Sequence, residues 1–168
     1  MSRPELIRKG AQQRVGPLAP TLEHGIFTLV VGGETFGLPV GCVHTIFRAA
    51  AVTVVPLGPR EVVGLVNLRG KIVTAVSLRL RLDLDDHGPH DGTLAIGIEH
   101  EGETFALFVD EVGDVITVSE DAHIASPPNF SAVRLALTAA VYRLESRILP
   151  VLDLAAVLRF TPHEPVAA

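Results

Sequence analysis

The side chains best able to bind a metal gather in one stretch, residues 83–92, which holds four aspartates and two histidines among glycine and proline. Asp83, Asp85 and His87 have the spacing of the first ligands in a calcium-binding loop. Such a loop ends on a glutamate that binds calcium through both carboxylate oxygens, but Leu94 stands at that position. Histidine is also a poor calcium ligand, so the calcium interpretation fails.

A zinc site in the same stretch would have to start from His87 and His90, which are three residues apart. No third ligand is evident in the sequence. Polar stretches with glycine and proline between apolar segments are typical of solvated linkers. We therefore expect no metal, no cofactor and no catalytic residue. A small metal-dependent enzyme built on residues 83–91 remains the alternative.

The rest of the chain offers no second set of chemically active side chains. The sequence contains neither a Walker phosphate loop nor a Gly-x-Gly-x-x-Gly motif after a strand, so no nucleotide site is supported. The single cysteine, Cys42, lies among apolar neighbours, which indicates a buried and inert thiol. The other five histidines are scattered singly along the chain. The sequence therefore predicts a protein that is not an enzyme.

Composition excludes two kinds of partner. The formal net charge is −5, with 14 basic and 19 acidic residues, so the chain has no broad cationic surface for nucleic acid. No run of about 18 apolar residues could span a bilayer, so we expect no direct membrane insertion and a cytoplasmic protein. Hydrophobic residues make up 48% of the chain, without tryptophan, and the many valines favour an aliphatic β-sheet core.

A sequence echo divides the chain into two similar halves. Residues 33–43 and 102–112 both open with Gly-Glu-Thr-Phe and place apolar residues at alternating positions. This alternation is typical of half-buried strands, and the glycines before each segment suit a tight turn. Each half begins with a β-hairpin and has room for five short strands. The echo therefore predicts an all-β chain of two small five-stranded barrels.

The predicted organisation places a polar linker between these halves and a tail at each end. Ser77 and Asp153 hold matching places before short apolar runs, so we expect each to cap a short helical segment. The basic residues near the N-terminus are interpreted as a solvated tail. The expected parts are a flexible N-terminal tail at 1–24, a domain at 25–160 made of subdomains 25–82 and 93–160 with the linker 83–92 between them, and a C-terminal tail at 161–168.

Residues 64–79 read Gly-Leu-Val-Asn-Leu-Arg-Gly-Lys-Ile-Val-Thr-Ala-Val-Ser-Leu-Arg, and they strongly resemble the signature of the CheW-like family. Residues 27–43 resemble the opening hairpin of that family, 109–112 its mid-chain hairpin exit and 148–153 its closing strand. The resemblance extends over about residues 25–160. It implies an all-β fold of two SH3-like five-stranded β-barrel subdomains that share a hydrophobic core, with short helical segments.

Members of that family are adaptors without chemistry of their own, so the resemblance implies a scaffold in bacterial chemosensory signal transduction. The implied partners are the regulatory domain of a CheA-type histidine kinase and the cytoplasmic tip of methyl-accepting chemoreceptors. Ring assembly with homologous domains, at receptor arrays on the inner face of the membrane, is a further expectation. Flagellar chemotaxis, twitching motility and gene regulation stay open as the pathway served.

Matching by position carries a set of contact residues over from the family. One wall of the receptor-facing surface is expected at Val43 and Ile46 and the other at Val112 and Val115. Phe105 is the candidate for the kinase-facing surface, with a place in the barrel core as its alternative. The whole set of expected receptor- or kinase-binding residues is Val43, Thr45, Ile46, Gly64, Asn67, Arg69, Gly70, Phe105, Val112 and Val115.

Two positions depart from the family pattern. Ser77 stands where the family usually has an aspartate, a mild change because serine caps a helix about as well. Thr45 stands where the family usually has a glutamate, which removes a charge that could organise Arg69 or meet a basic receptor residue. Arg69 itself is expected to be a contact residue, and partner choice is expected to differ from that of a typical chemotaxis adaptor.

Overall fold

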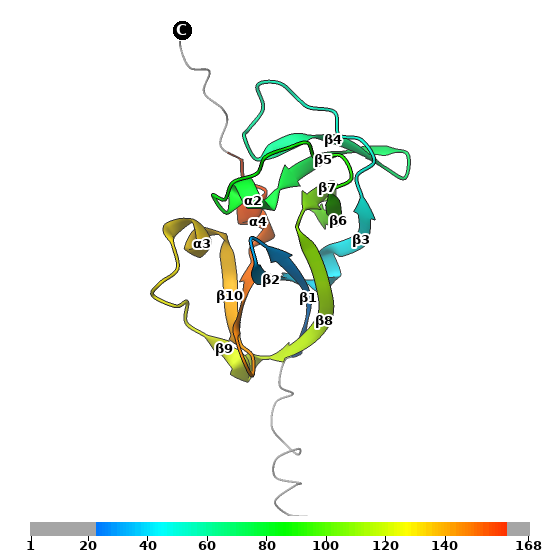
Figure 1. Cartoon of the computed structure of the whole chain (residues 1–168). Coiled ribbons are helices and arrows are strands. Elements are labelled where there is room, and N and C mark those ends of the chain that lie inside the picture. The colour runs from blue at the N-terminus through cyan, green and yellow to red at the C-terminus, as the bar shows by residue number, and fades with distance from the viewer. Residues whose placement is uncertain (1–22, 161–168) are drawn as a thin grey trace, which may run out of the picture.

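The computed structural model describes residues 23–160, which fold into two β-sheets with short helices between them (Figure 1). The prediction of an all-β chain with two strand units is confirmed, and the short strand β9 (His123–Ile124) adds a sixth strand to one unit.

The helical elements are η1 (Val40–Cys42), α2 (Leu78–Arg81), η2 (Glu120–Ala122), α3 (Ala132–Leu137) and α4 (Leu154–Val157). Sheet A has the order β8 (Glu111–Ser119), β1 (Glu23–Val31), β2 (Glu34–Pro39), β11 (Ile148–Leu152), β10 (Thr138–Arg143) and β9 (His123–Ile124). Sheet B has the order β3 (Val43–Arg48), β6 (Leu94–His100), β7 (Glu103–Phe108), β5 (Lys71–Ser77) and β4 (Val62–Leu68).

Each sheet takes strands from both halves of the chain. Sheet A joins the first hairpin, β1–β2, to the strands β8 through β11, and sheet B joins β3, β4 and β5 to the second hairpin, β6–β7. The sheets therefore do not follow the expected bounds 25–82 and 93–160. The stretch 83–92 connects α2 to β6, so it joins two parts of sheet B instead of separating two barrels.

Two parallel strand pairs produce this exchange. β2 pairs with β11 through Gly37 and Val151, and β5 pairs with β7 from Thr74 opposite Phe105 to Ser77 opposite Phe108. A tight turn cannot join parallel neighbours, so these pairs form between segments far apart in the chain. Hairpin signals in a sequence are local and carry no information about such pairs, so the sequence did not predict that the two sheets exchange strands.

One apolar core lies between the two sheets and receives side chains from both. Leu29 and Leu38 enter it from sheet A, Ile96 and Leu107 from sheet B, and Val157 from α4, all of them fully buried. Burial of each such side chain stabilises the fold by roughly 1.5–3 kcal/mol. Two smaller clusters lie within the separate sheets. The shared core that the family resemblance implied is therefore present between the sheets.

The two predicted helix caps are confirmed. The Ser77 hydroxyl oxygen accepts a hydrogen bond from the Leu80 backbone N–H at the start of α2, and an Asp153 carboxylate oxygen accepts one from the Ala156 N–H at the start of α4, both at 3.3 Å. The Ser77 hydroxyl also donates to the Asp86 carboxylate in the stretch 83–92. An aspartate at position 77 could not make this second bond, because two carboxylates would repel each other.

Asp110, in the connection from β7 to β8, ties the two sheets together. Its carboxylate accepts hydrogen bonds from Nε and Nη2 of Arg79 at 2.8 and 2.7 Å, and from the backbone N–H of Gly32 at 2.8 Å. Arg79 belongs to α2, which follows sheet B strand β5, whereas Gly32 lies in the β1–β2 turn of sheet A. Burial raises the pKa of Asp110, but these hydrogen bonds and the charge of Arg79 outweigh burial and leave that pKa below its ordinary value.

Replacement of Asp110 tests this tie. We expect Asp110→Asn to lower the free energy of unfolding at neutral pH by about 1–2 kcal/mol, a range that allows for solvent screening of a partly exposed pair. Because the folded-state pKa is lowered, the contribution of the carboxylate is fully present above the unfolded pKa of about 3.9 and disappears as pH falls through the folded value. Urea unfolding of both proteins across this range should show the difference shrinking in acid, and a difference independent of pH would contradict the electrostatic role.

Candidate functional site

β3 forms one edge of sheet B. Half-buried and exposed residues alternate along it, but a shift in the strand register means that this alternation does not mark its two faces. Val43 and Ile46 stand opposite Ile98 and Ile96 of β6, which belong to the core between the sheets, so both face that core. The strand register shifts between Val43 and Thr45, and such a bulge allows two residues three apart to share a face.

β8 forms one edge of sheet A and repeats the arrangement. Val112 and Val115 stand opposite Leu29 and Phe27 of β1, which belong to the same core between the sheets. Val112 and Val115 are also three residues apart, and they too share one face. β3 and β8 each follow the hairpin of their own half and pair with the first strand of the other hairpin, so they are equivalent edge strands.

A bulge at Gly113 explains how Val112 and Val115 come to face the same way. Thr28 of β1 donates its hydroxyl hydrogen to the Asp114 carbonyl oxygen at 2.7 Å, at the point where the register shifts. A Cβ atom at Gly113 would collide with the Thr28 hydroxyl. Glycine inside an otherwise alternating strand is a sequence signal for such a bulge, and the sequence reasoning did not use it.

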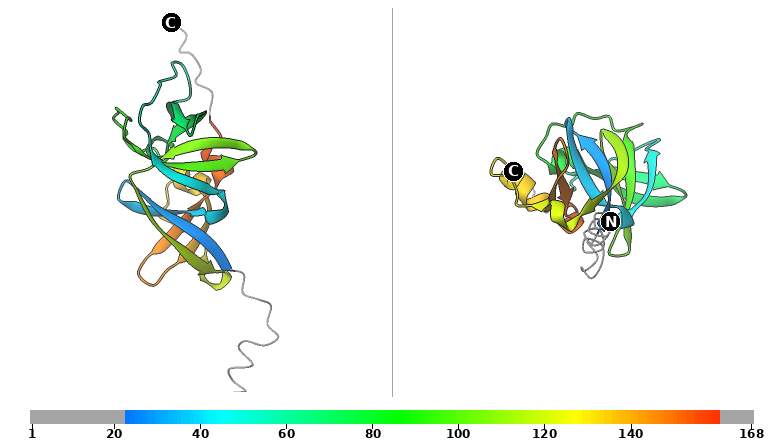
Figure 2. Two further views of the ribbon diagram at one scale, coloured as in Figure 1. Left: turned by 90° about the vertical axis from the view of Figure 1, so that its right-hand side faces the viewer. Right: turned by 90° about the horizontal axis from the view of Figure 1, so that it is seen from below.

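Together these four residues form a surface that we call the edge-strand surface: Val43, Ile46, Val112 and Val115. Val43 and Val112 are half-buried and pack against the core between the sheets. Ile46 and Val115 leave 44% and 56% of their area exposed. Figure 1 shows β3 and β8 on one side of the molecule, and the left view of Figure 2 turns that side toward the reader. Val43 and Ile46 thus share one face of β3, and Val112 and Val115 share one face of β8.

The turn at 67–70 joins β4 to β5 and presents Arg69 to solvent. Arg69 and Gly70 both have positive φ, +52° and +84°, and the Asn67 side-chain oxygen accepts a hydrogen bond from the Gly70 N–H at 2.9 Å. Nη2 of Arg69 lies 3.4 Å from the hydroxyl oxygen of Thr45 on β3. Asn67 and Gly70 therefore shape the turn, and the turn places the Arg69 guanidinium beside β3.

Gly64 lies apart from this surface, buried within sheet B. A Cβ atom there would collide with the backbone carbonyl oxygen of Thr53, which pairs with Leu65 in an isolated bridge. The close approach lets the chain after β3 pair with β4. The geometry gives Gly64 a structural role and no exposed surface for a partner.

Phe105 is half-buried on β7, opposite Ile98, and its ring packs against the core between the sheets. It also lines a cavity of about 420 Å³ with Leu158 and Arg159, just after α4. Its neighbours on β7, Ala106 and Leu107, are fully buried. This placement favours the core alternative for most of the Phe105 side chain.

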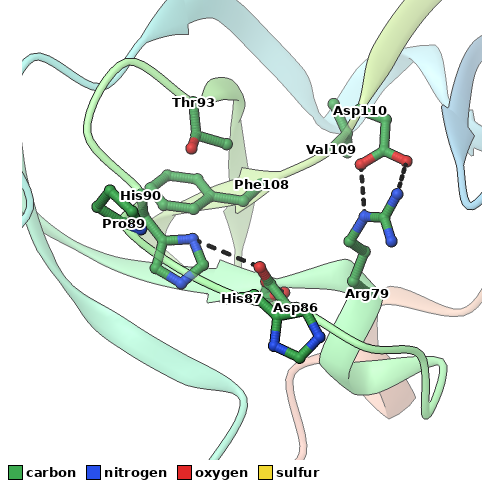
Figure 3. A pocket seen from close by; sticks show the side chains of 10 residues that line it. Arg79, Asp86, His87, Pro89, His90, Thr93, Phe108, Val109 and Asp110 are labelled. Carbon is green, nitrogen blue, oxygen red and sulfur yellow. Dashed lines mark hydrogen bonds and ion pairs between the residues drawn. The ribbon is translucent and has the colours of Figure 1, made fainter.

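The carboxylates of the stretch 83–92 bind other groups of the protein. Asp91 accepts a hydrogen bond from the Val52 N–H at 2.8 Å, and Asp86 accepts one from Ser77. Nδ1 of His90 lies 3.8 Å from a carboxylate oxygen of Asp86, and both side chains line a cavity of about 220 Å³ (Figure 3). Within residues 23–160, no three histidine, cysteine, aspartate or glutamate side chains gather in a way that could hold a metal ion. The stretch is a connection fastened to sheet B.

Cys42 fits the interpretation of an inert thiol. Its Sγ donates a hydrogen bond to the carbonyl oxygen of Pro39 at 2.8 Å. Burial raises the pKa of the Cys42 thiol above its ordinary value. A raised pKa leaves less thiolate, which is the nucleophilic form, so the site disfavours covalent chemistry.

The sequence reasoning missed a second region of apolar exposure. Val54 and Leu57 leave 73% and 88% of their area exposed in the connection from β3 to β4, and Leu57 has a φ of +64°. The run Val-Val-Pro-Leu-Gly-Pro at 54–59 is the signal that could have marked it, because proline and glycine keep an apolar segment out of the sheet. Grouped exposed apolar side chains are typical of interaction surfaces.

Comparison with known proteins places the chain in a family. A sequence model described as the CheW-like domain matches residues 25–161. The chain belongs to the CheW-like domain family. None of the helices within residues 23–160 is long and apolar enough to cross a bilayer.

Relatives and a solved structure extend this finding. Chemotaxis protein CheW of Bacillus subtilis (strain 168) is 29% identical over 133 residues, which cover 79% of this chain and 85% of that protein. Chemotaxis protein CheW of Klebsiella aerogenes is 32% identical over 111 residues, 66% of this chain and 64% of that protein. The crystal structure of scaffolding protein TtCheW from Thermoanaerobacter tengcongensis has a TM-score of 0.73 at 23% identity and covers 86% of this chain and 99% of that chain. The two share one fold.

Alanine substitution separates Gly64 and Gly70, the two glycines of the segment 64–79, by role. Gly64→Ala should lower the free energy of unfolding by more than about 2 kcal/mol, because its Cβ meets backbone that cannot move aside. Gly70→Ala should cost only about 1 kcal/mol, since its Cβ meets nothing and only the positive φ is unfavourable. Urea unfolding of both variants checks this, and equal losses would show that the close approach at Thr53 does not constrain the fold.

Proposed function

We propose that this chain is a non-enzymatic adaptor that couples chemoreceptors to a CheA-type histidine kinase in chemosensory signal transduction. Its membership of the CheW-like family and its relatives named chemotaxis protein CheW support the proposal. The structural observation that carries it is the edge-strand surface, where two equivalent edge strands expose Ile46 and Val115 above half-buried Val43 and Val112.

The edge-strand surface has the chemistry of a helix-binding site. Its centre is aliphatic and rests on the core, so an apolar helix face laid on it would bury the exposed parts of Ile46 and Val115. Binding of a helix to this surface requires no chemical change in the bound segment, as expected of a scaffold. The cytoplasmic tip of a chemoreceptor is a helical hairpin, and we assign it to this surface.

An adaptor of this kind needs a second surface for the kinase regulatory domain, since it holds both partners at once. Val54 and Leu57 expose apolar area away from the edge-strand surface, and they support a kinase contact in the connection from β3 to β4. Phe105 has a smaller part in this proposal, because its partly buried side chain packs against the core between the sheets.

The proposal also states where the chain acts and what it assembles with. The chain acts in the cytoplasm, at chemoreceptor arrays on the inner face of the membrane, where it joins rings with homologous domains. A pathway that controls flagella, one that controls twitching motility and one that controls gene expression would use the same surfaces.

Charged substitutions on the edge-strand surface test the receptor contact. Ile46→Glu and Val115→Glu should each weaken binding of a chemoreceptor tip fragment from the same organism by about tenfold or more, because each places a charge where apolar area is buried. Both side chains are already half-exposed, so thermal unfolding should change little. Isothermal titration calorimetry measures the affinities.

Leu135→Glu is the matched control, since Leu135 on α3 is exposed to a similar degree, 47%, and α3 lies on the other side of the molecule from β3 in Figure 1. It should bind the tip fragment as the parent does. All three variants should bind the CheA-type regulatory domain normally. If Leu135→Glu loses tip binding while Ile46→Glu and Val115→Glu keep it, the receptor contact lies away from β3 and β8.

A further inference from the structure

Thr28 places a hydroxyl group in the buried, apolar middle of β1, between Phe27 and Leu29. Thr28 and Ser77 are the polar residues that are buried within residues 23–160, and Thr28 is 4% exposed. Valine has nearly the same shape and would fill such a position without removing a hydroxyl from water. The hydroxyl of Thr28 therefore needs a hydrogen-bond partner that offsets its burial.

That partner is the backbone of the bulge in β8. Thr28 lies opposite two residues of β8, Gly113 and Asp114, because the register of β1 and β8 shifts by one residue at this point. The extra residue of a bulge is left out of the regular ladder of backbone hydrogen bonds. The Thr28 hydroxyl donates to the Asp114 carbonyl oxygen at 2.7 Å, so a side chain supplies a bond where the ladder is interrupted.

The position of the bulge decides where two valines of the edge-strand surface point. Val112 and Val115 are three residues apart, which in a regular strand would place them on opposite faces. They share a face only while the extra residue lies between them, and a shift of the bulge along β8 would turn one of them away. Because a Cβ atom at Gly113 would collide with the Thr28 hydroxyl, the glycine and the hydroxyl together fix the bulge at this place.

The equivalent strand β3 carries a bulge of the same kind between Val43 and Ile46. A threonine and a glycine meet there too, with their places exchanged: a Cβ atom at Gly97 of β6 would lie only 2.7 Å from the methyl carbon of Thr45. In both edge strands a threonine thus packs over a glycine of the neighbouring strand. The hydroxyl that donates to the bulge carbonyl is that of Thr28.

We propose that Thr28 is a positioning residue for the edge-strand surface: its hydroxyl holds the bulge at Gly113 and Asp114, and so keeps Val112 and Val115 turned together toward the bound helix. The inference rests on the proposed function and adds a determinant of affinity that lies beneath the surface. Without the bond, only a fraction of the molecules would present both valines at once. The apparent affinity would fall in proportion to that fraction.

Thr28→Val tests this role, because it removes the hydroxyl and keeps the shape. It should weaken binding of a chemoreceptor tip fragment from the same organism by about three- to tenfold, the range expected for one lost hydrogen bond. Thr28→Ser keeps the hydroxyl and should bind within about twofold of the parent. Both variants should bind the CheA-type regulatory domain as the parent does. Isothermal titration calorimetry measures both affinities.

Thr138→Val is the matched control. The Thr138 hydroxyl donates to the Arg134 carbonyl oxygen at 2.6 Å, so this variant also loses a short bond from a threonine to a backbone carbonyl. Thr138 lies on β10, which β1, β2 and β11 separate from β8 in sheet A (Figure 1). Thr138→Val should lower the melting temperature and leave tip binding unchanged. A purely structural Thr28 would behave in the same way.

Hydrogen exchange gives a measurement that needs no partner. In Thr28→Val the backbone amides of residues 113–115 should exchange faster than in the parent, with those of β10 unchanged. If Thr28→Val does not fold, Gly113→Ala takes its place, because the added methyl group displaces the same hydroxyl from an exposed position and should weaken tip binding likewise.

The outcomes separate this inference from the proposed function. If Thr28→Val binds the tip fragment as tightly as the parent, or if Thr138→Val loses as much affinity, the inference is wrong and the proposed function stands. Failure of Thr28→Ser to keep the affinity of the parent would also refute the role of the hydroxyl. If the parent binds no tip fragment while it still binds the kinase regulatory domain, the receptor assignment fails and the inference fails with it.

Discussion

The rest of the molecule depends on one constraint. The last main strand of each half pairs in parallel with a strand from the hairpin of the other half. β11 lies beside β2 and β5 lies beside β7, so neither sheet can be completed without both halves. The apolar faces of the sheets then meet over one core, which α2 and α4 help to fill. Asp110 reinforces this arrangement at the point where the chain passes from sheet B to sheet A. The two halves thus form a single folding unit.

The same exchange creates the candidate binding surface. β3 and β8 are the strands that follow a crossing from one sheet to the other. Each lies at the edge of its sheet, and within residues 23–160 no strand pairs with its outer side. Edge strands are normally protected by charge, twist or covering segments. Here bulges turn Val43 with Ile46, and Val112 with Val115, toward the junction between the sheets. The exposed aliphatic area is therefore a consequence of the topology and lies where a rigid core supports it.

The sequence predicted the hairpins and the helix caps because these depend on local signals. Alternation and the glycine turns mark β1–β2 and β6–β7, and Ser77 and Asp153 precede apolar runs in the way that caps do. The exchange of strands could not be predicted, since it rests on long-range parallel pairs such as Gly37 with Val151. The resemblance grouped Gly64 with Arg69, although packing separates them: Gly64 is buried against Thr53 whereas Arg69 is exposed. Burial and backbone approach decide such roles, and neither can be read from a motif.

The central claim is that a helical receptor tip binds across the equivalent edge strands of the two sheets. Nuclear magnetic resonance of the isotope-labelled chain, titrated with the tip fragment, tests it most directly because it reports every backbone amide at once. The account predicts that the largest shift changes arise from Val43–Ile46 on β3, from Val112–Val115 on β8 and from the 67–70 turn, with α3 and β10 unchanged. Shift changes confined to one of the two edge strands, or centred on α3 and β10, would contradict it.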